Sequence, residues 1–278
     1  MFENIIGHEE IKCLFEKNLM KNNISHAYLF SGKKGVGKCT MAKEFAKKIL
    51  NVDKLESSPD YKYICKRDDK KDIIIEQIRK ELIDDIYQVP VSGEKKVYII
   101  DDAESLNIAS QNALLKTLEE PPKYVVIILV SSNTSAFLTT VLSRVNLINF
   151  NGVDDNVLKE HLNNNYNIIL TENVVKYVEG SIGQAIDIVE DGVLEKFKQV
   201  EEIYNNLKNK DIIKALFLST NIKFNENQLL DYFEYLLYIN MHYSCIKFVE
   251  RAKLRLKYNG NYDIVIDNMI LKVFDNII

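Results

Sequence analysis

The stretch that decides the fold reads AYLFSGKKGVGKCT and spans residues 27–40. It opens with an apolar run, 27–30, and continues into a glycine-rich turn of pattern G-x-x-x-x-G-K, from Gly32 to Lys38. Glycines in such a turn let backbone N–H groups point at phosphate, and the N-terminus of a following helix adds positive potential. Apolar side chains at helical spacing predict that helix over 38–50. Strand, turn and helix in this order predict a phosphate-binding loop.

Two further apolar runs extend this unit into a sheet. Residues 97–100 and 125–130 are unbroken and rich in β-branched side chains, which suits central parallel strands covered on both faces. Helical spacing appears at 11–20, 73–86 and 109–118. Strands alternating with helices of this length predict an α/β fold, a parallel sheet flanked by helices. The segments that read as loops are 51–72 and 90–95.

Strand signals disappear after about residue 150, and the rest of the chain reads as helical. We therefore expect three domains: an α/β domain at 1–150, a small helical domain at 151–194, and a helical C-terminal domain at 195–278. Apolar side chains between Leu229 and Ile239 are too widely spread for one face, which predicts a helix packed on several sides.

Composition excludes several classes of protein. Of 278 residues, 46% are hydrophobic and 27% charged, as in ordinary globular proteins. No apolar run approaches the ~20 residues that cross a bilayer, and the first residues lack the pattern of an export signal. The net charge of −4 argues against a protein covered in DNA-binding cations, so any nucleic-acid role falls to partners or to a local patch. Four cysteines without a C-x-x-C pair fit reduced thiols and a cytoplasmic protein.

The predicted loop supplies the candidate nucleotide-binding residues. Lys38 would reach the β- and γ-phosphates, and the next position normally carries a hydroxyl ligand for Mg²⁺. That position is Cys39, whose thiol is a weak ligand for a hard cation, and Thr40 lies about 100° further round the helix. We expect ATP or ADP with Mg²⁺ to bind weakly or not at all. The nucleotide-binding candidates are Gly32, Gly35, Gly37, Lys38, Cys39, Thr40 and Ser132.

The ends of the other two strands carry further polar candidates. Asp101 follows the strand at 97–100 and resembles the aspartate that holds Mg²⁺ in P-loop ATPases. The next position normally carries a glutamate that orients the attacking water, but here it is Asp102, one methylene shorter. A displacement of about 1 Å costs ~100-fold in rate, so this pair is a degenerate catalytic site. Ser132, just past the strand at 125–130, is placed to contact a γ-phosphate.

Several motifs together resemble the clamp-loader subunits of the AAA+ family. The most specific is NALLKTLEEPP at 112–122. The others are IIGH at 5–8, SHAYLF at 25–30, SPDY at 58–61 and LSR at 142–144. The resemblance implies an AAA+ P-loop domain at 1–150, a helical lid at 151–194 and a helical collar for oligomerisation at 195–278.

Departures from the family pattern point to one of its branches. ATPase members carry a hydroxyl residue after the P-loop lysine, Asp-Glu after the strand that corresponds to 97–100, and an arginine in a Gly-Ser-x-Arg-Asp-Ala stretch. This chain has Cys39, Asp102 and Gly183 at those positions. Phosphoryl transfer depends on positioned charges, so three losses together predict little hydrolysis. The pattern resembles the δ′ subunits of bacterial DNA polymerase III, which belong to a nucleotidyltransferase holoenzyme.

Arg144 matches an arginine that clamp loaders donate in trans to ATP held by a neighbouring subunit. The resemblance therefore implies a stator in a hetero-pentamer with τ/γ and δ subunits. Its further partners would be the sliding clamp and, through the complex, primed DNA; no membrane is implied. An arginine finger is worth ~10³–10⁵ in rate.

The sequence leaves two other readings open. One is a catalytic τ/γ-type ATPase with substituted motifs, and the other is a small-molecule P-loop kinase, which would not explain the 112–122 motif. Many family members carry a four-cysteine zinc module before SPDY, but 51–57 has no cysteine, and Cys65 alone cannot hold zinc. We therefore predict no metal site, zinc included.

Overall fold

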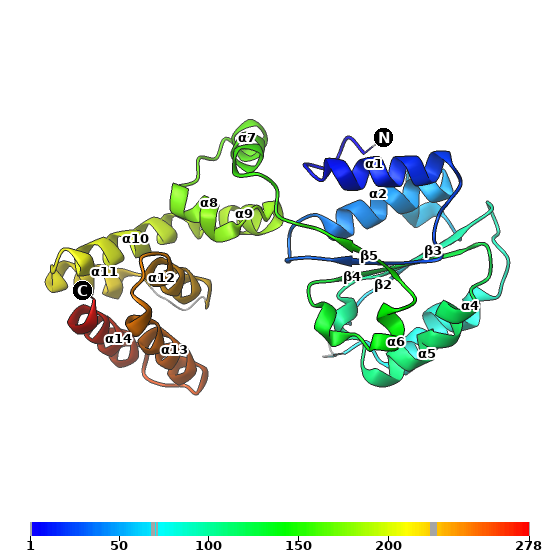
Figure 1. Cartoon of the computed structure of the whole chain (residues 1–278). Coiled ribbons are helices and arrows are strands. Elements are labelled where there is room, and N and C mark those ends of the chain that lie inside the picture. The colour runs from blue at the N-terminus through cyan, green and yellow to red at the C-terminus, as the bar shows by residue number, and fades with distance from the viewer. Residues whose placement is uncertain (1, 68–69, 71, 223–226, 278) are drawn as a thin grey trace. The chain divides into compact units, whose positions relative to one another are not determined.

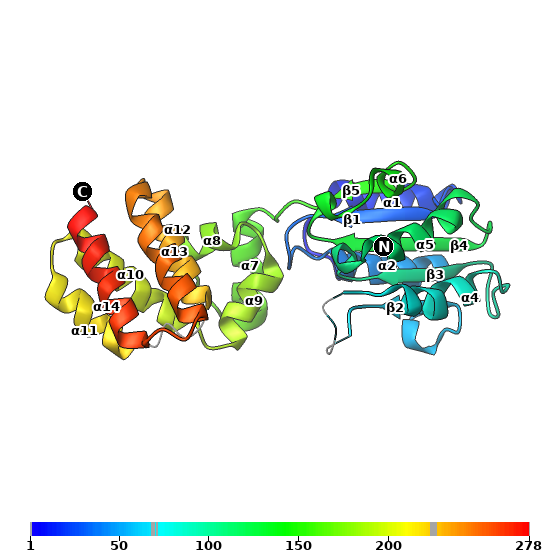
Figure 2. The same cartoon turned by 90° about the horizontal axis from the view of Figure 1, so that it is seen from below.

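The computed structural model describes residues 2–67, 70, 72–222 and 227–277. They form two compact units, which Figures 1 and 2 show in two views. Unit 1 comprises Met1–Glu160 with Gly180–Gln184, and unit 2 comprises His161–Glu179 with Ala185–Ile278. Positions 68–69 and 71 of the predicted loop, and 223–226 and 278 of the predicted collar, lie outside the described residues.

Unit 1 is built on a five-stranded parallel sheet in the order β2-β3-β4-β1-β5. The central strands are fully buried because both faces of the sheet are covered. All five strands run the same way, so their carboxyl ends share one edge, where ligands bind in open α/β sheets. The strands are β1 (Ala27–Ser31), β2 (Tyr61–Ile64), β3 (Lys96–Ile100), β4 (Val125–Ser131) and β5 (Asn146–Asn149).

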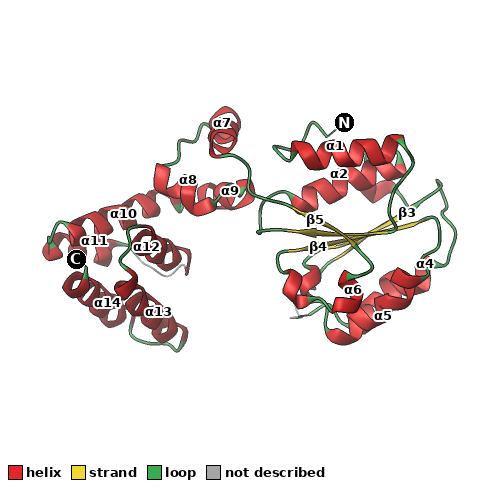
Figure 3. Ribbon diagram, viewed as in Figure 1, coloured by secondary structure: helices red, strands yellow, loops and turns green. Residues whose placement is uncertain are grey.

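Helices cover the two faces of this sheet, as Figure 3 shows. On one face, α1 (Glu9–Met20) and α2 (Lys38–Leu50) bury a cluster in which the rings of Phe15 and Phe45 stack at 4.2 Å. The other face packs against α3 (Ile75–Ile78), the π-helical turn η2 (Arg79–Ile83), α4 (Asp84–Ile86), α5 (Ile108–Glu119) and α6 (Thr139–Leu142). Three short 3₁₀ turns complete the unit: η1 (Leu55–Ser57), η3 (Ala103–Ser105) and η4 (Thr134–Ala136).

The remaining helices carry the chain through unit 2. First come α7 (Asp155–Tyr166), α8 (Glu172–Val178) and α9 (Ile182–Glu190), of which α7 and α9 begin in unit 1. The bundle that follows consists of α10 (Leu194–Lys208), α11 (Ile212–Asn221), α12 (Asn227–Ile239), α13 (Tyr243–Lys257) and α14 (Tyr262–Asn276). Side chains cap several of these helices: Asp211 accepts from the backbone N–H of Lys214, and Asn261 from that of Ile264. In the core of unit 2, the rings of Phe197 and Tyr232 stack with their centres 4.3 Å apart.

The fold class predicted from the sequence is confirmed: a parallel sheet flanked by helices, followed by helices alone. The prediction for α12 is also confirmed, since six apolar side chains around the helix are buried. One expectation was wrong. The segment 51–72 is not all loop, because it contains η1 and strand β2, whose backbone pairs with β3 from Tyr61 opposite Val97 to Ile64 opposite Ile100. The sequence analysis also missed β5, an edge strand with a polar sequence.

Candidate nucleotide site

The P-loop joins β1 to α2 at the carboxyl edge of the sheet, as predicted. Its lysine folds back onto the loop: Lys38 Nζ donates to the carbonyls of Gly32 at 2.7 Å and Lys33 at 2.6 Å. Burial lowers the pKa of Lys38, and the nearby carboxylates of Glu104, Asp101 and Asp102 oppose that shift. Lys38, Asp101 and Asp102 are therefore brought together, while Thr40 is exposed on the first turn of α2.

A tyrosine binds the carboxylate that was expected to hold Mg²⁺. Tyr63, on β2, donates its hydroxyl to Asp101 Oδ2 at 2.5 Å, and the Tyr63 hydroxyl oxygen also lies 3.8 Å from Cys39 Sγ. The ammonium of Lys43 lies over the Tyr63 ring, 4.7 Å from its centre. Burial, and secondarily the charge of Asp101, raise the pKa of Cys39 to about 11, so this thiol is protonated at neutral pH.

These residues do not fit a magnesium ion. Mg²⁺ requires oxygen ligands in near-octahedral geometry, whereas here Asp101 is already bound by a phenol and the usual hydroxyl ligand is replaced by a neutral thiol. Within residues 2–67, 70, 72–222 and 227–277, no group of three or more His, Cys, Asp or Glu side chains is placed to hold a metal ion.

The sequence analysis missed a third carboxylate, Glu104, which accepts hydrogen bonds from Ser132, the residue expected to contact the γ-phosphate. Ser132 donates its hydroxyl to Glu104 Oε1, and its backbone N–H donates to the same oxygen at 3.2 Å. Burial raises the pKa of Glu104, but the hydrogen bonds from Ser132 and its neighbours outweigh it, and the net shift is downward. Asp102 adopts a left-handed conformation, with φ of 47°, and its side chain is exposed. Ser132 is thus held by a carboxylate three residues beyond Asp101.

The start of α9 packs directly on the P-loop. Ser181 Oγ donates to the carbonyl of Lys34 at 2.9 Å, and the N–H of Gly183 donates to the carbonyl of Gly35 at 2.9 Å. A Cβ atom at Gly183 would lie 2.8 Å from Gly35 Cα, closer than real Cβ atoms approach. Position 183, where ATPase members would carry arginine, therefore has no room for any side chain in this arrangement.

Arg144 lies just past α6, away from the P-loop contacts. Its guanidinium pairs with Glu119 at 2.8 Å and donates to the carbonyl of Thr140 at 2.8 Å and to Ser143 Oγ at 3.0 Å. Glu119 belongs to the 112–122 motif, so two motifs that are separate in sequence meet here. One third of the Arg144 side chain is exposed.

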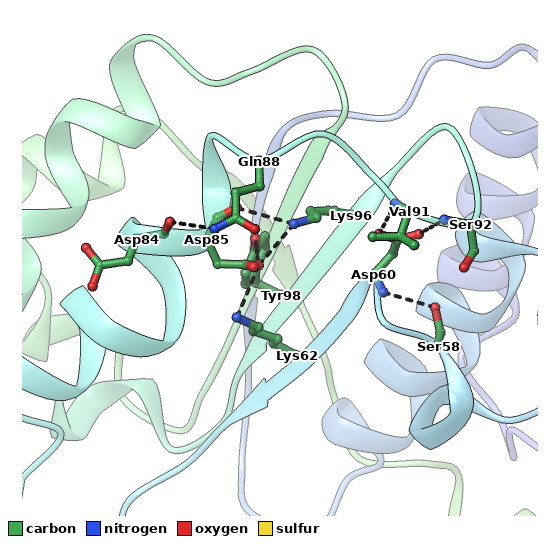
Figure 4. Close-up of polar contacts among 10 residues, drawn as sticks. All are labelled: Ser58, Asp60, Lys62, Asp84, Asp85, Gln88, Val91, Ser92, Lys96 and Tyr98. Carbon is green, nitrogen blue, oxygen red and sulfur yellow. Dashed lines mark hydrogen bonds and ion pairs between the residues drawn. The ribbon is translucent and has the colours of Figure 1, made fainter.

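The SPDY motif has a structural role outside the nucleotide site, as Figure 4 shows. The buried carboxylate of Asp60 accepts the backbone N–H groups of Val91 and Ser92, both at 2.7 Å, and so fixes the loop between α4 and β3. Beside it, Asp85 accepts the hydroxyl of Tyr98 at 2.6 Å and the ammonium groups of Lys62 and Lys96 at 3.2 Å. Burial raises the pKa of Asp85, but these three partners outweigh it and hold the pKa below its ordinary value.

Comparison with known proteins decides the family. A family model described as DNA polymerase III, delta subunit, matches residues 7–154, just over half of the chain. The DNA polymerase III subunit gamma of Buchnera aphidicola subsp. Baizongia pistaciae is 31% identical over 307 aligned positions, covering 94% of this chain and 80% of that protein. The chain belongs to the clamp-loader family of DNA polymerase III subunits.

Other comparisons agree with this clamp-loader assignment. The DNA polymerase III subunit tau/gamma of Haemophilus influenzae is 32% identical over 222 residues, covering 72% of this chain. This chain spans 32% of that protein's length and 43% of the gamma subunit of Buchnera aphidicola subsp. Acyrthosiphon pisum. A crystal structure of a DNA polymerase III gamma subunit-related protein from Thermotoga maritima shares the fold. The superposition of the two structures has a TM-score of 0.54 at 17% sequence identity, and it covers 94% of this chain and 99% of the Thermotoga maritima chain. In the described part of the chain, every helix is too short or too polar to cross a bilayer.

Proposed function

We propose that this clamp-loader chain is the δ′ stator, which supports loading of the sliding clamp onto primed DNA and hydrolyses little ATP itself. In this proposal it assembles with τ/γ and δ subunits in the cytoplasm as part of the DNA polymerase III holoenzyme. The helices at 151–194 serve as its lid, and those at 195–278 as its collar.

The observation that carries the proposal is the hydrogen bond from Tyr63 to Asp101. It occupies the carboxylate that an ATPase would use for Mg²⁺, beside a thiol in place of the hydroxyl ligand. The contact of Gly183 with Gly35 adds a second loss, because the γ-phosphate arginine is replaced by a residue that touches the loop backbone. Two independent parts of the site thus favour a subunit without its own hydrolysis, which binds ATP or ADP weakly or not at all.

Arg144 supplies the catalytic contribution in this proposal. Its ion pair with Glu119 is partly exposed, and such pairs are worth only ~0–1 kcal/mol, so the guanidinium is readily released to a phosphate. A neighbour's ATP would offer it a bidentate, more highly charged partner. In the absence of a neighbour's ATP, Glu119 and Thr140 bind the Arg144 guanidinium at the surface.

The test uses the loader reconstituted from this chain with τ/γ-type and δ-type subunits. We expect Arg144→Ala to leave assembly intact but to remove part of the DNA-stimulated ATPase, since one site would lose a finger worth ~10³-fold or more. Arg67→Ala is the matched control, because Arg67 also forms a partly exposed ion pair, with Glu81 at 2.9 Å. Lys38→Ala should change loading little. If Lys38→Ala abolished loading and Arg144→Ala did not, the stator proposal would be wrong.

A second candidate is a catalytic τ/γ-type ATPase. It is favoured by the names of the relatives above, which are gamma and tau/gamma subunits. Steady-state ATP hydrolysis by the isolated chain separates the two, since turnover near ~1 s⁻¹ lies in the ordinary enzyme range and would support the ATPase. In both cases we expect no stoichiometric zinc, which elemental analysis would check.

A further inference from the structure

Helix α13 carries a row of basic and aromatic side chains on its outer face. Tyr243, Lys247, Arg251 and Arg255 follow one another at intervals of four residues, so consecutive members lie about one turn apart on a ridge that slants round the helix. All four are exposed, and Tyr258, the residue that follows the helix, is 75% exposed. Three successive cations thus lie between two exposed rings along about four turns.

The positive charge of this ridge is not neutralised within unit 2. Helix α13 holds five cations against a single carboxylate, Glu250, although the whole chain has a net charge of −4. Of the five, Lys253 is bound by Asp231 and Glu234. Lys247, Arg251 and Arg255 form no ion pair with any residue that the structure describes, and Lys247 lies 5.1 Å from the centre of the Phe248 ring.

A shallow groove between α13 and α14 concentrates this charge. Arg251 and Arg255 form one wall, and Asn268 and Lys272 form the other. No acidic side chain lines the groove in this fully described part of the bundle. The floor is Phe248, Ala252, Val265 and Met269. The cavity measures only about 10 Å³, so it has no room to seat an anchoring side chain of another protein.

We propose that this face of unit 2 binds the backbone of single-stranded DNA. Guanidinium groups at four-residue spacing, with a lysine opposite, suit successive phosphates, and the planar fork of arginine matches phosphate geometry. Tyr243 and Tyr258 are exposed rings on which unpaired bases stack, which favours a single strand over a duplex. The shallow floor favours a phosphate backbone over an acidic peptide, which would need a pocket for its side chains. This inference rests on the clamp-loader family and not on the δ′ assignment.

The experiment measures binding of the full chain to a fluorescein-labelled oligo-dT of about 20 nucleotides by anisotropy. Each phosphate contact on a single strand contributes ~0.7 to the slope of log K against log salt, or about fourfold in affinity at 0.15 M salt. Arg251→Ala with Arg255→Ala should therefore weaken binding roughly 14-fold and reduce the slope by about 1.4. Lys17→Ala with Lys21→Ala is the matched control, since it removes two exposed cations at the same spacing, one from the last turn of α1 and one from its C-cap, and it should leave both values unchanged.

A second variant separates stacking from charge. Tyr258→Ala should weaken binding about fivefold or more without changing the salt slope, because a base loses its stacking partner while the phosphate contacts stay. Three results would each overturn the proposal. The first is no binding of the oligonucleotide by the wild-type chain, and the second is an equal loss of affinity in the Lys17→Ala, Lys21→Ala control. The third is displacement of the oligonucleotide by poly-glutamate of equal charge, together with an unchanged affinity of the Tyr258→Ala variant. The last would identify an acidic protein segment as the partner. None of these measurements depends on loader assembly or on Arg144.

Discussion

Replacing Gly183 by alanine tests whether α9 and the P-loop are as close as the structure places them. The new Cβ atom would lie 2.8 Å from Gly35 Cα and 3.0 Å from the Gly35 carbonyl oxygen. Carbon atoms pack best at ~3.5–4.0 Å, so the two segments must separate by roughly 0.7 Å. That shift stretches the 2.9 Å hydrogen bond from the Gly183 N–H to Gly35 beyond hydrogen-bond range.

The magnitude follows from three effects. Overpacking against backbone costs ~1–3 kcal/mol, and the lost hydrogen bond adds about 1 kcal/mol. The better helix propensity of alanine returns at most ~1 kcal/mol. We therefore expect Gly183→Ala to destabilise unit 1 by about 1–3 kcal/mol, which lowers its melting temperature by roughly 2–12 °C for a unit of this size.

Calorimetry and hydrogen exchange of the loop together check this expectation. The matched control is Gly93→Ala, because a Cβ atom at Gly93 meets nothing within 4 Å. We expect faster amide exchange in the peptide 32–40 for Gly183→Ala and unchanged exchange for Gly93→Ala. Gly183→Arg should be at least as damaging and should not create ATPase activity. If Gly183→Ala proved as stable as the control, with the same exchange at 32–40, the close packing of α9 on the loop would be refuted.

Three further predictions concern unit 1. Tyr63→Phe combined with Cys39→Ser should increase Mg²⁺-dependent ADP affinity by calorimetry, because it frees Asp101 and restores a hydroxyl; unchanged affinity would mean that Tyr63 does not obstruct the site. With its pKa near 11, Cys39 should be alkylated at pH 8 about a hundredfold more slowly than a thiol of ordinary pKa 9.0, its rate rising up to about pH 11. Peptide mapping against the exposed Cys13 measures this, and equal rates would contradict it. Asp60→Ala should speed hydrogen exchange at the two loop amides that its carboxylate holds, and unchanged exchange there would show that other groups fix the loop.

Local patterns predicted the parts of the fold that local physics decides. The runs at 97–100 and 125–130 are apolar because both faces of their strands are covered. Each could therefore be predicted as a strand from its own sequence, without knowledge of the strands it pairs with. Strand β2 has the sequence YKYI, in which a lysine interrupts the apolar run, and it lies at an edge of the sheet. Only its pairing with β3 makes it a strand. Strand β5, with sequence NLIN, likewise pairs with β1 alone.

The site shows the same division. Lys38 and Asp101 follow directly from motifs that end predicted strands. Tyr63 was not predicted because its approach to Asp101 depends on the register of β2, an element read as loop. The contact of Gly183 with Gly35 joins residues nearly 150 positions apart, and no sequence pattern encodes such a contact.

The π-helical turn at 79–83 bears on how this chain tolerates changes of length. Apolar side chains at 74, 78, 82 and 86 repeat every four residues, whereas an α-helix completes a turn in 3.6. Ile74 precedes the helix, and from Ile78 a purely α-helical run would carry the stripe 40° round the axis at each step, about 80° by Ile86. The wider turn absorbs the excess, and Ile78, Leu82 and Ile86 all remain fully buried. The segment thus holds one residue more than an ordinary helix needs, so the deletion of a single residue here should leave the same face buried.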